Sequence, residues 1–286
     1  MSFRMDRSKM HIMPVQFGPC LGPRQNREGC RYLYEYPRDV VNHTWVYESE
    51  ASAIDPFLPE RLTLDSPHVI INHRMNRNLS WLAGRGYNLI SVRVPATFHG
   101  VQEDVKGFFM LAIWENEPDP IIFGREQLGY CKTFANISDL EETKSGCVHA
   151  EASSWGFPFL ELDAELAAKA PDQEELCRIM LDPGRTGDFN YKYIPKTGDG
   201  FLECDVEYMT LTPKVTTYPE GVPSFPPPEL SYCDGQIAWH RPMWEDMPTQ
   251  FRIVQCLESL PIYRVLGVIK STSKSLNDSF DQRIIR

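Results

Sequence analysis

The chain has 286 residues, of which 42% are hydrophobic and 24% charged, the composition of a globular protein large enough to bury a sizeable core. Its 29 Lys and Arg residues against 39 Asp and Glu residues leave a formal net charge of -10, which disfavours nucleic acid and anionic membranes as partners. Phosphate-loop, dinucleotide-binding, Gly-x-Ser-x-Gly and HExxH motifs do not occur, so the commonest motif-defined enzyme classes are excluded.

Cysteine and histidine spacing argues against disulfides and metals. The eight cysteines are scattered without CxxC spacing, in a chain long enough not to need disulfide bonds, so we expect free thiols in a reducing compartment. The seven histidines show no ligand spacing, and no cofactor motif is present, so we expect no metal and no cofactor. No apolar run reaches the length of a signal or membrane segment. We therefore expect a cytoplasmic protein with no membrane partner.

Short β-rich segments separated by Pro, Gly, Asn and Asp predict a mainly β protein. In chain order they are HVIINHRM, YNLISVRVP, GFFMLAIWE, FLECDVEYMTL and YRVLGVIK. In YNLISVRVP, the odd-numbered residues from Leu89 to Arg93 alternate with an apolar set from Ile90 to Val94, as in a strand buried on one side. GFFMLAIWE is apolar at both parities, which indicates a central strand covered on both faces.

Helical patterns are few and lie between the strands. The sequence predicts helices near residues 50–58, 164–170, 173–180 and 250–260. The Pro-rich stretch SFPPPELS, residues 224–231, is interpreted as a stiff surface connection rather than a domain linker. Without an internal repeat or a clear boundary, we expect a single domain over residues 1–286, of the α+β class, with a mainly antiparallel sheet and peripheral helices.

One lysine is a candidate nucleophile. A lysine attacks a ketone only as the neutral amine, which requires burial in apolar surroundings or a nearby positive charge. Lys132 lies in GREQLGYCKTFANI, whose apolar and aromatic residues can bury it. Without further information, a lysine in such a segment is more often an exposed turn residue.

A family resemblance favours the catalytic interpretation. NEPDPIIFGREQLGYCKTFANI resembles the strand, Gly-Arg-Glu turn and active-site segment of the acetoacetate decarboxylase superfamily, and GPRQNREGCRYLYEYP resembles its Asn-Arg-Glu element. Weaker similarity follows in the family's order through DPFLPERLTLDSP, VRVPATFHGVQEDVKGFF and LPIYRVLG. The resemblance implies a strongly curved sheet closed into a cone-like barrel, and a homo-oligomer.

The resemblance also implies roles for individual residues. Lys132 matches the Schiff-base lysine, Tyr130 the tyrosine two residues before it, and Arg27 the arginine that binds the substrate carboxylate. Without the resemblance, Arg27 would be interpreted as a surface residue. Glu126 is the most plausible remaining acid or base near the lysine, although Arg125 and Glu126 could instead form a structural ion pair.

The sequence departs from the decarboxylase pattern in several places. The two active-site glutamates of the family correspond to Asn72 and to the region of Asn88 and Leu89, which cannot supply a carboxylate. Thr133 stands where the decarboxylase has a second lysine, and Cys131 where it has proline. We therefore expect desolvation alone to lower the pKa of the nucleophile, and a lysine restored at position 133 to lower it further.

These features lead to three functional hypotheses. The first is a cofactor-independent lyase that decarboxylates a β-keto acid larger than or different from acetoacetate through an iminium on Lys132. The second is an aldolase-dehydratase that uses the same lysine on a 2-oxo acid and an aldehyde. The third is a non-catalytic barrel that binds a small carboxylated or apolar metabolite, with Lys132 and Arg27 as anchors.

Overall fold

The computed structural model describes residues 4–31, 37–143, 146–198, 200, 202–214, 225–276 and 281–286. The strands are β1 (Arg38–Glu48), β2 (Leu62–Leu64), β3 (His68–Leu79), β4 (Arg85–His99), β5 (Asp104–Glu115), β6 (Lys132–Phe134), β7 (Asn136–Ile137), β8 (Glu141–Glu142), β9 (Cys147–Ser154), β10 (Phe157–Glu165), β11 (Gly187–Pro195), β12 (Cys204–Pro213), β13 (Glu229–Trp239), β14 (Arg264–Ser275) and β15 (Arg283–Ile285). The helices are α1 (Ala51–Ile54), α2 (Pro118–Phe123), α3 (Gln173–Met180) and α4 (Phe251–Glu258), with short turns at Val15–Phe17, Asp55–Phe57 and Ser80–Leu82 and a π-helical turn at Gly124–Leu128.

The described strands belong to one sheet, which is mainly antiparallel as predicted. Its order is β15-β12-β11-β5-β4-β3-β1-β14-β13-β10-β9-β7, with β2 added to β4, β6 to β5 and β8 to β9. The parallel pairs in this order are β5 with β6 and β5 with β11. The order is an open path that ends at β15 and β7, so the expected closure into a cone-like barrel is not confirmed in this part of the chain.

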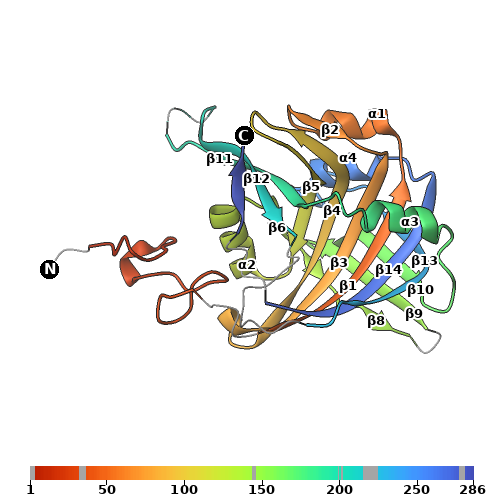
Figure 1. Cartoon of the computed structure of the whole chain (residues 1–286), viewed down its shortest axis with the longest axis horizontal. Helices are drawn as coiled ribbons and strands as arrows, with labels where there is room; N and C mark the ends of the chain where they lie inside the picture. The colour runs from red at the N-terminus through yellow and green to blue at the C-terminus, as the bar shows by residue number, and fades with distance from the viewer. Residues whose placement is uncertain are drawn as a thin grey trace.

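The sheet curves around the main hydrophobic core. Trp45 of β1 and Ile90 of β4 share this core with Phe159 and Leu162 of β10 and with Leu257 of α4. On the other face of β1 and β14, α3 covers a smaller apolar cluster. Figure 1 shows these long strands side by side, with α3 across their outer face. The curvature leaves the outer face of β3, β4 and β5 available for a site.

The alternation predicted for YNLISVRVP is confirmed. Ile90 and Val92 are fully buried in the main core, whereas Leu89, Ser91 and Arg93 face a cavity on the other side of the sheet. GFFMLAIWE is covered on both faces, also as predicted. Ser91 and Arg93 of β4 therefore present polar groups to the cavity.

Three of the four helix predictions are confirmed. Segment 173–180 is α3, 50–58 is α1 followed by a 3-10 turn, and 250–260 contains α4. The prediction for 164–170 was wrong, because Ala164 and Glu165 end β10 and pair with β13, so cross-strand pairing overrides helix propensity. We missed α2, whose prolines lie in the first turn, where their missing N–H groups have no intrahelical partner to lose.

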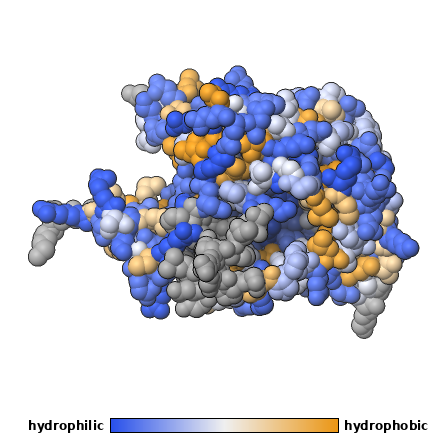
Figure 2. All heavy atoms as spheres, in the orientation of Figure 1, coloured by the Kyte–Doolittle hydropathy of each residue, from blue (hydrophilic) through white to orange (hydrophobic). Residues whose placement is uncertain are grey.

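Surface features match the composition. Figure 2 shows hydrophilic residues over most of the visible face, with smaller apolar patches.

All eight cysteines are free thiols, as predicted. Among the described residues, no helix is long and apolar enough to cross a membrane. Residue 224 of the Pro-rich stretch lies outside the described residues, and the stretch runs into β13 from Glu229 onward.

Candidate active site

A cavity of about 140 Å³ lies on the outer face of the sheet, between β3, β4, β5, β6 and α2. Trp81 and Phe123 form part of its apolar wall, and their rings meet edge to face at 5.6 Å. The charged and tyrosine side chains that line it are Arg38, Arg74, Tyr87, Arg93, Glu115, Tyr130, Lys132 and Asp188. We call this space the inner cavity.

Strand register places the lysine beside a carboxylate. Glu115 of β5 pairs with Leu89 of β4, and Leu89 pairs with Arg74 of β3, so these residues form a row across the cavity floor. Lys132 of β6 pairs with Ile113, two residues from Glu115 on the same face of β5. As a result, Lys132 Nζ lies 2.8 Å from Glu115 Oε1.

The Lys132 side chain is held inside the protein. Only 9% of the residue is exposed, and Glu115 is completely buried. Lys132 Nζ also donates a hydrogen bond of 3.1 Å to the carbonyl oxygen of Pro120 and lies 5.2 Å from the centre of the Tyr130 ring. The expectation that the surrounding segment buries this lysine is therefore met.

The electrostatics of the pair differ from the sequence-based expectation. Burial is the largest single cause and disfavours the ammonium of Lys132, but Glu115, Tyr87 and Tyr130 together outweigh it, so the pKa of Lys132 is raised. Burial also raises the pKa of Glu115. We expected desolvation alone to lower the pKa of Lys132, and this was wrong because the sequence alone did not place a carboxylate beside it.

The geometry allows a proton to pass between the two groups. The 2.8 Å contact is an ion pair by distance, yet neither oxygen of Glu115 accepts an aligned hydrogen bond from the described residues. Because burial disfavours both charges, transfer of one proton from Lys132 to Glu115 leaves a neutral amine and a neutral carboxylic acid. Such a transfer would supply a nucleophilic amine without releasing a proton to solvent.

Tyr130 lies beside Lys132 and lines the inner cavity. Its hydroxyl is 2.7 Å from Thr212 Oγ1, and burial raises the pKa of Tyr130 to about 12. The phenol consequently stays neutral and able to share a hydrogen bond across the neutral pH range. Its ring forms part of the cavity wall beside the lysine.

Arg27 and Glu126 are not brought to the cavity. Both side chains are exposed, Arg27 in a turn near the N-terminus and Glu126 in the π-helical turn, and neither lines the inner cavity. Arg125 does not pair with Glu126, because its guanidinium donates a hydrogen bond of 2.8 Å to the backbone carbonyl of Lys132. Arg125 therefore fixes the strand that carries the nucleophile.

The residues that sequence reasoning missed are Glu115, Arg74 and Arg38. A signal for two of them was present, since Glu115 is the polar end of an otherwise apolar strand and Arg74 lies two residues after Asn72 on one strand face. Their meeting depends on register between strands, which one sequence does not reveal. Among the described residues, no group of three or more His, Cys, Asp or Glu side chains could hold a metal ion.

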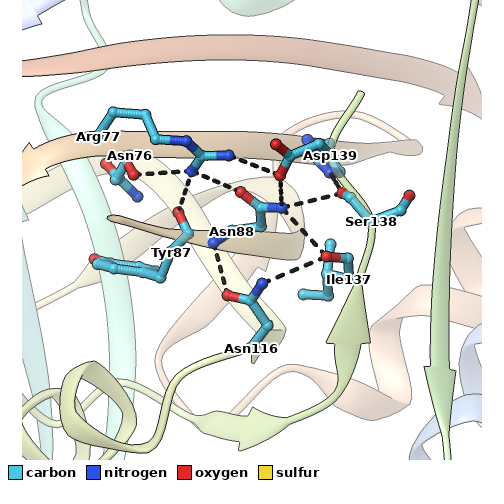
Figure 3. Close-up of polar contacts among 9 residues, drawn as sticks. Asn76, Arg77, Tyr87, Asn88, Asn116, Ile137, Ser138 and Asp139 are labelled. Carbon is cyan, nitrogen blue, oxygen red and sulfur yellow. Dashed lines mark hydrogen bonds and ion pairs between the residues drawn. The ribbon is translucent and has the colours of Figure 1, made fainter. Parts of the chain in front are cut away.

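Asn72 and Asn88, which the resemblance places at or near the positions of the family glutamates, have different environments. Asn72 lines the inner cavity and donates to Thr44 Oγ1 at 2.8 Å. Asn88 instead points to the other side of β4, where its Nδ2 donates to Asp139 at 2.7 Å and its Oδ1 accepts from Arg77 at 2.9 Å (Figure 3). Asn88 therefore joins β4 to the segment after β7, and the adjacent Leu89 faces the cavity.

Gly124 packs directly against the nucleophile. A Cβ at this position would lie 2.5 Å from Cδ, 2.6 Å from Cε and 2.8 Å from Nζ of Lys132, while the backbone φ of -63° accepts any residue. We expect Gly124→Ala to displace the lysine side chain and to reduce turnover by about 100-fold. Thermal unfolding should change little by comparison, and turnover equal to that of the original protein would contradict the close packing.

Thr133 faces away from the nucleophile. It does not line the inner cavity, and its hydroxyl donates to the carbonyl oxygen of Ile113 at 3.3 Å. Contrary to the expectation from sequence, we now expect Thr133→Lys to leave the acidic limb of the activity profile unchanged, because the new ammonium would not enter the cavity. A shift of that limb to lower pH would show that it does.

Comparison with known proteins assigns the family. The family model for acetoacetate decarboxylase matches residues 14–272, which is most of the chain. The chain therefore belongs to the acetoacetate decarboxylase family and is an enzyme of the carbon–carbon lyase class. Among curated proteins, no sequence matches it.

Solved structures agree with this fold. An acetoacetate decarboxylase-like enzyme from Sphingomonas wittichii RW1 aligns with a TM-score of 0.60 and 14% identity, covering 84% of this chain and 89% of the other. Acetoacetate decarboxylase from Legionella pneumophila aligns with a TM-score of 0.60 and 17% identity, covering 85% and 87%. The enduracididine biosynthesis enzyme MppR, in complex with the condensation product of pyruvate and imidazole 4-carboxaldehyde, aligns with a TM-score of 0.57 and 12% identity, covering 87% and 88%.

Proposed function

We propose that this enzyme decarboxylates a β-keto acid other than acetoacetate through an iminium on Lys132. The observation that carries the proposal is the buried Lys132 amine 2.8 Å from the buried Glu115 carboxylate in a cavity that also contains cationic side chains. A buried amine whose proton can pass to an adjacent carboxylate meets the requirement for a nucleophilic lysine.

The proposed reaction uses these two groups in sequence. Lys132 passes a proton to Glu115, its neutral amine attacks the substrate ketone, and Glu115 donates a proton as water leaves to form the iminium. The bond to the β-carboxylate then breaks, carbon dioxide departs, and the electron pair moves into the iminium to give an enamine. Protonation of the enamine carbon and hydrolysis release the ketone and regenerate Lys132.

Arg74 is the proposed partner of the substrate carboxylate. It shares the row of Glu115, lines the cavity and has no carboxylate partner among the described residues. We expect Arg74→Gln to raise the KM for a keto acid more than that for a matched neutral ketone in an imine-forming assay. Arg27→Gln, the matched control outside the cavity, should change the two values less. If Arg27→Gln had the larger effect on the KM for the keto acid, Arg27 rather than Arg74 would bind the substrate carboxylate.

An aldolase-dehydratase activity is the second candidate. Glu115 is close enough to Lys132 to remove a proton from the carbon next to an iminium, which would produce an enamine able to attack an aldehyde. The MppR complex with a pyruvate condensation product has the same fold. Carbon dioxide release from a β-keto acid would favour decarboxylation, and loss of both pyruvate and an aldehyde without gas release would favour condensation.

Borohydride trapping tests the shared intermediate. Reduction of an iminium makes the bond permanent, so incubation with a β-keto acid and borohydride should add one stable mass that peptide mapping assigns to Lys132. An adduct on another lysine, or none with β-keto acids or pyruvate, would overturn the mechanism. The non-catalytic hypothesis requires no such bond.

A further inference from the structure

A second, larger cavity adjoins the inner cavity. This outer cavity of about 650 Å³ lies between β11, the ends of β12 and β14 and the segment before β13. It shares with the inner cavity the residues Arg38, Arg74, Arg93, Tyr130 and Asp188. The two spaces are therefore adjacent, and three arginines line both of them.

The three arginines come from different positions along the sheet. On β3, Arg74 pairs with Asn42 of β1, and Arg38 lies four residues earlier on β1, about 13 Å away along the strand. Arg93 lies four residues beyond Leu89 on β4, in the opposite direction. Their long side chains nevertheless line the same two cavities. Burial, and to a lesser extent the charges of Arg38 and Arg93, lower the pKa of Arg74.

The outer cavity is strongly cationic although the whole chain has a net charge of -10. Two carboxylates line it, Asp182 and Asp188, against six cationic side chains, which are Arg38, Arg74, Arg93, Arg185, Lys214 and Lys274. Such a local excess of positive charge attracts anions to this cavity.

Only some of these cations are neutralised by the protein. Arg93, Arg185 and Lys274 each form an ion pair of 2.7 Å, with Asp188, Asp65 and Asp39 respectively. In contrast, Arg38, Arg74 and Lys214 have no carboxylate partner in the described part of the chain. The Nε atom of Arg38 is buried without a hydrogen-bond partner there, and Arg74 Nε donates only to the neutral amide of Asn42.

The charge balance of the inner cavity indicates how many anionic groups a ligand should carry. Four cationic side chains, Arg38, Arg74, Arg93 and Lys132, face two carboxylates, Glu115 and Asp188. Partly buried charges without partners are unfavourable, so the site favours a ligand that supplies two negative charges. A simple keto acid such as acetoacetate supplies one.

We propose that the substrate is an oxo-dicarboxylate, with one carboxylate at Arg74 near Lys132 and the other at Arg38 and Lys214 in the outer cavity. The proposal rests on the proposed function, since it assumes that Lys132 forms an iminium with the same molecule. With 3-oxohexanedioate, the carboxylate β to the ketone leaves as carbon dioxide, a solvent proton takes its place on C2, and the product is 4-oxopentanoate. The distal carboxylate is unchanged.

Paired substrates test this proposal. 3-Oxohexanedioate and 3-oxohexanoate have the same chain length and ketone position, and only the first has a distal carboxylate. We expect kcat/KM to be at least about tenfold higher for the dicarboxylate, because 3-oxohexanoate cannot form the charge-assisted hydrogen bonds of the distal carboxylate. Higher ionic strength should reduce the ratio.

Variants locate the distal carboxylate. Arg38→Gln and Lys214→Met should each lower the ratio of kcat/KM between the two substrates, whereas Lys169→Met, an exposed lysine outside both cavities, should leave it unchanged. Lys214 is exposed, so its variant should fold even if Arg38→Gln does not.

The outcomes separate the two proposals. Equal trapping and turnover of both substrates would overturn the dicarboxylate assignment while supporting the lysine mechanism. Failure to trap either substrate at Lys132 would overturn the proposed function. A ratio that stays high in both Arg38→Gln and Lys214→Met would overturn the assignment of the outer cavity.

Discussion

Lys132→Arg is expected to abolish turnover and borohydride trapping together. A guanidinium remains protonated at every accessible pH and cannot form an imine with a ketone, so both signals should fall to the level without enzyme. The arginine can still pair with the completely buried Glu115, which avoids leaving that carboxylate without a cation. The loss should therefore be chemical rather than structural.

Controls for this variant are available in the same chain. Lys169→Arg changes an exposed lysine outside both cavities and should keep full activity and trapping. Circular dichroism and thermal unfolding of Lys132→Arg should confirm that the fold persists. Turnover in a folded Lys132→Arg protein would mean that the reaction proceeds without an imine.

The sequence predicted those parts of the fold that depend on local pattern. Period-2 alternation in YNLISVRVP correctly separated a core face from a cavity face, because burial on one side acts on every second residue. It could not predict which strands meet, since β14 and β1 are neighbours although more than two hundred residues separate them. The order of the sheet, and its open ends, depend on such distant pairings.

In the candidate site, too, the sequence predicted the residues of a local motif but not those brought in by pairing between strands. The local motif identified Lys132 and Tyr130, both of which line the inner cavity. Proximity in sequence was misleading for Glu126, six residues from the lysine, because the π-helical turn directs its side chain to solvent. The carboxylate beside the lysine is Glu115, seventeen positions earlier, which the parallel pairing of β5 and β6 brings to 2.8 Å.

Arg27 illustrates the limit of transferring a role from a short motif. The Asn-Arg-Glu element is present, but its arginine is exposed in a turn. Arg38, Arg74 and Arg93 instead supply the positive charge of the cavity. Arginine side chains are long, so arginines from several strands can bind the same ligand. A short motif around one arginine therefore does not predict which arginine lines the cavity.

Glu115→Gln should separate imine formation from turnover. The substitution keeps the size of the side chain but removes both the proton acceptor and the negative charge beside Lys132. We expect kcat to fall by about 10²–10⁴-fold, the contribution of a positioned acid or base. Lys132 should still react with a keto acid, because its amine and its apolar surroundings remain.

The pH dependence of borohydride trapping shows whether Glu115 raises or lowers the pKa of Lys132. In the original protein the Glu115 carboxylate raises the pKa of Lys132 against the opposing effect of burial. Without that carboxylate, burial, which is the largest single influence on this amine, favours the neutral form against the smaller opposing effects of Tyr87 and Tyr130. The pKa of Lys132 should fall below its ordinary value, so trapping in Glu115→Gln should extend to lower pH while turnover is lost. A shift of the trapping profile to higher pH, or full turnover in the folded variant, would show that Glu115 neither holds the proton of Lys132 nor acts as the acid and base of the reaction.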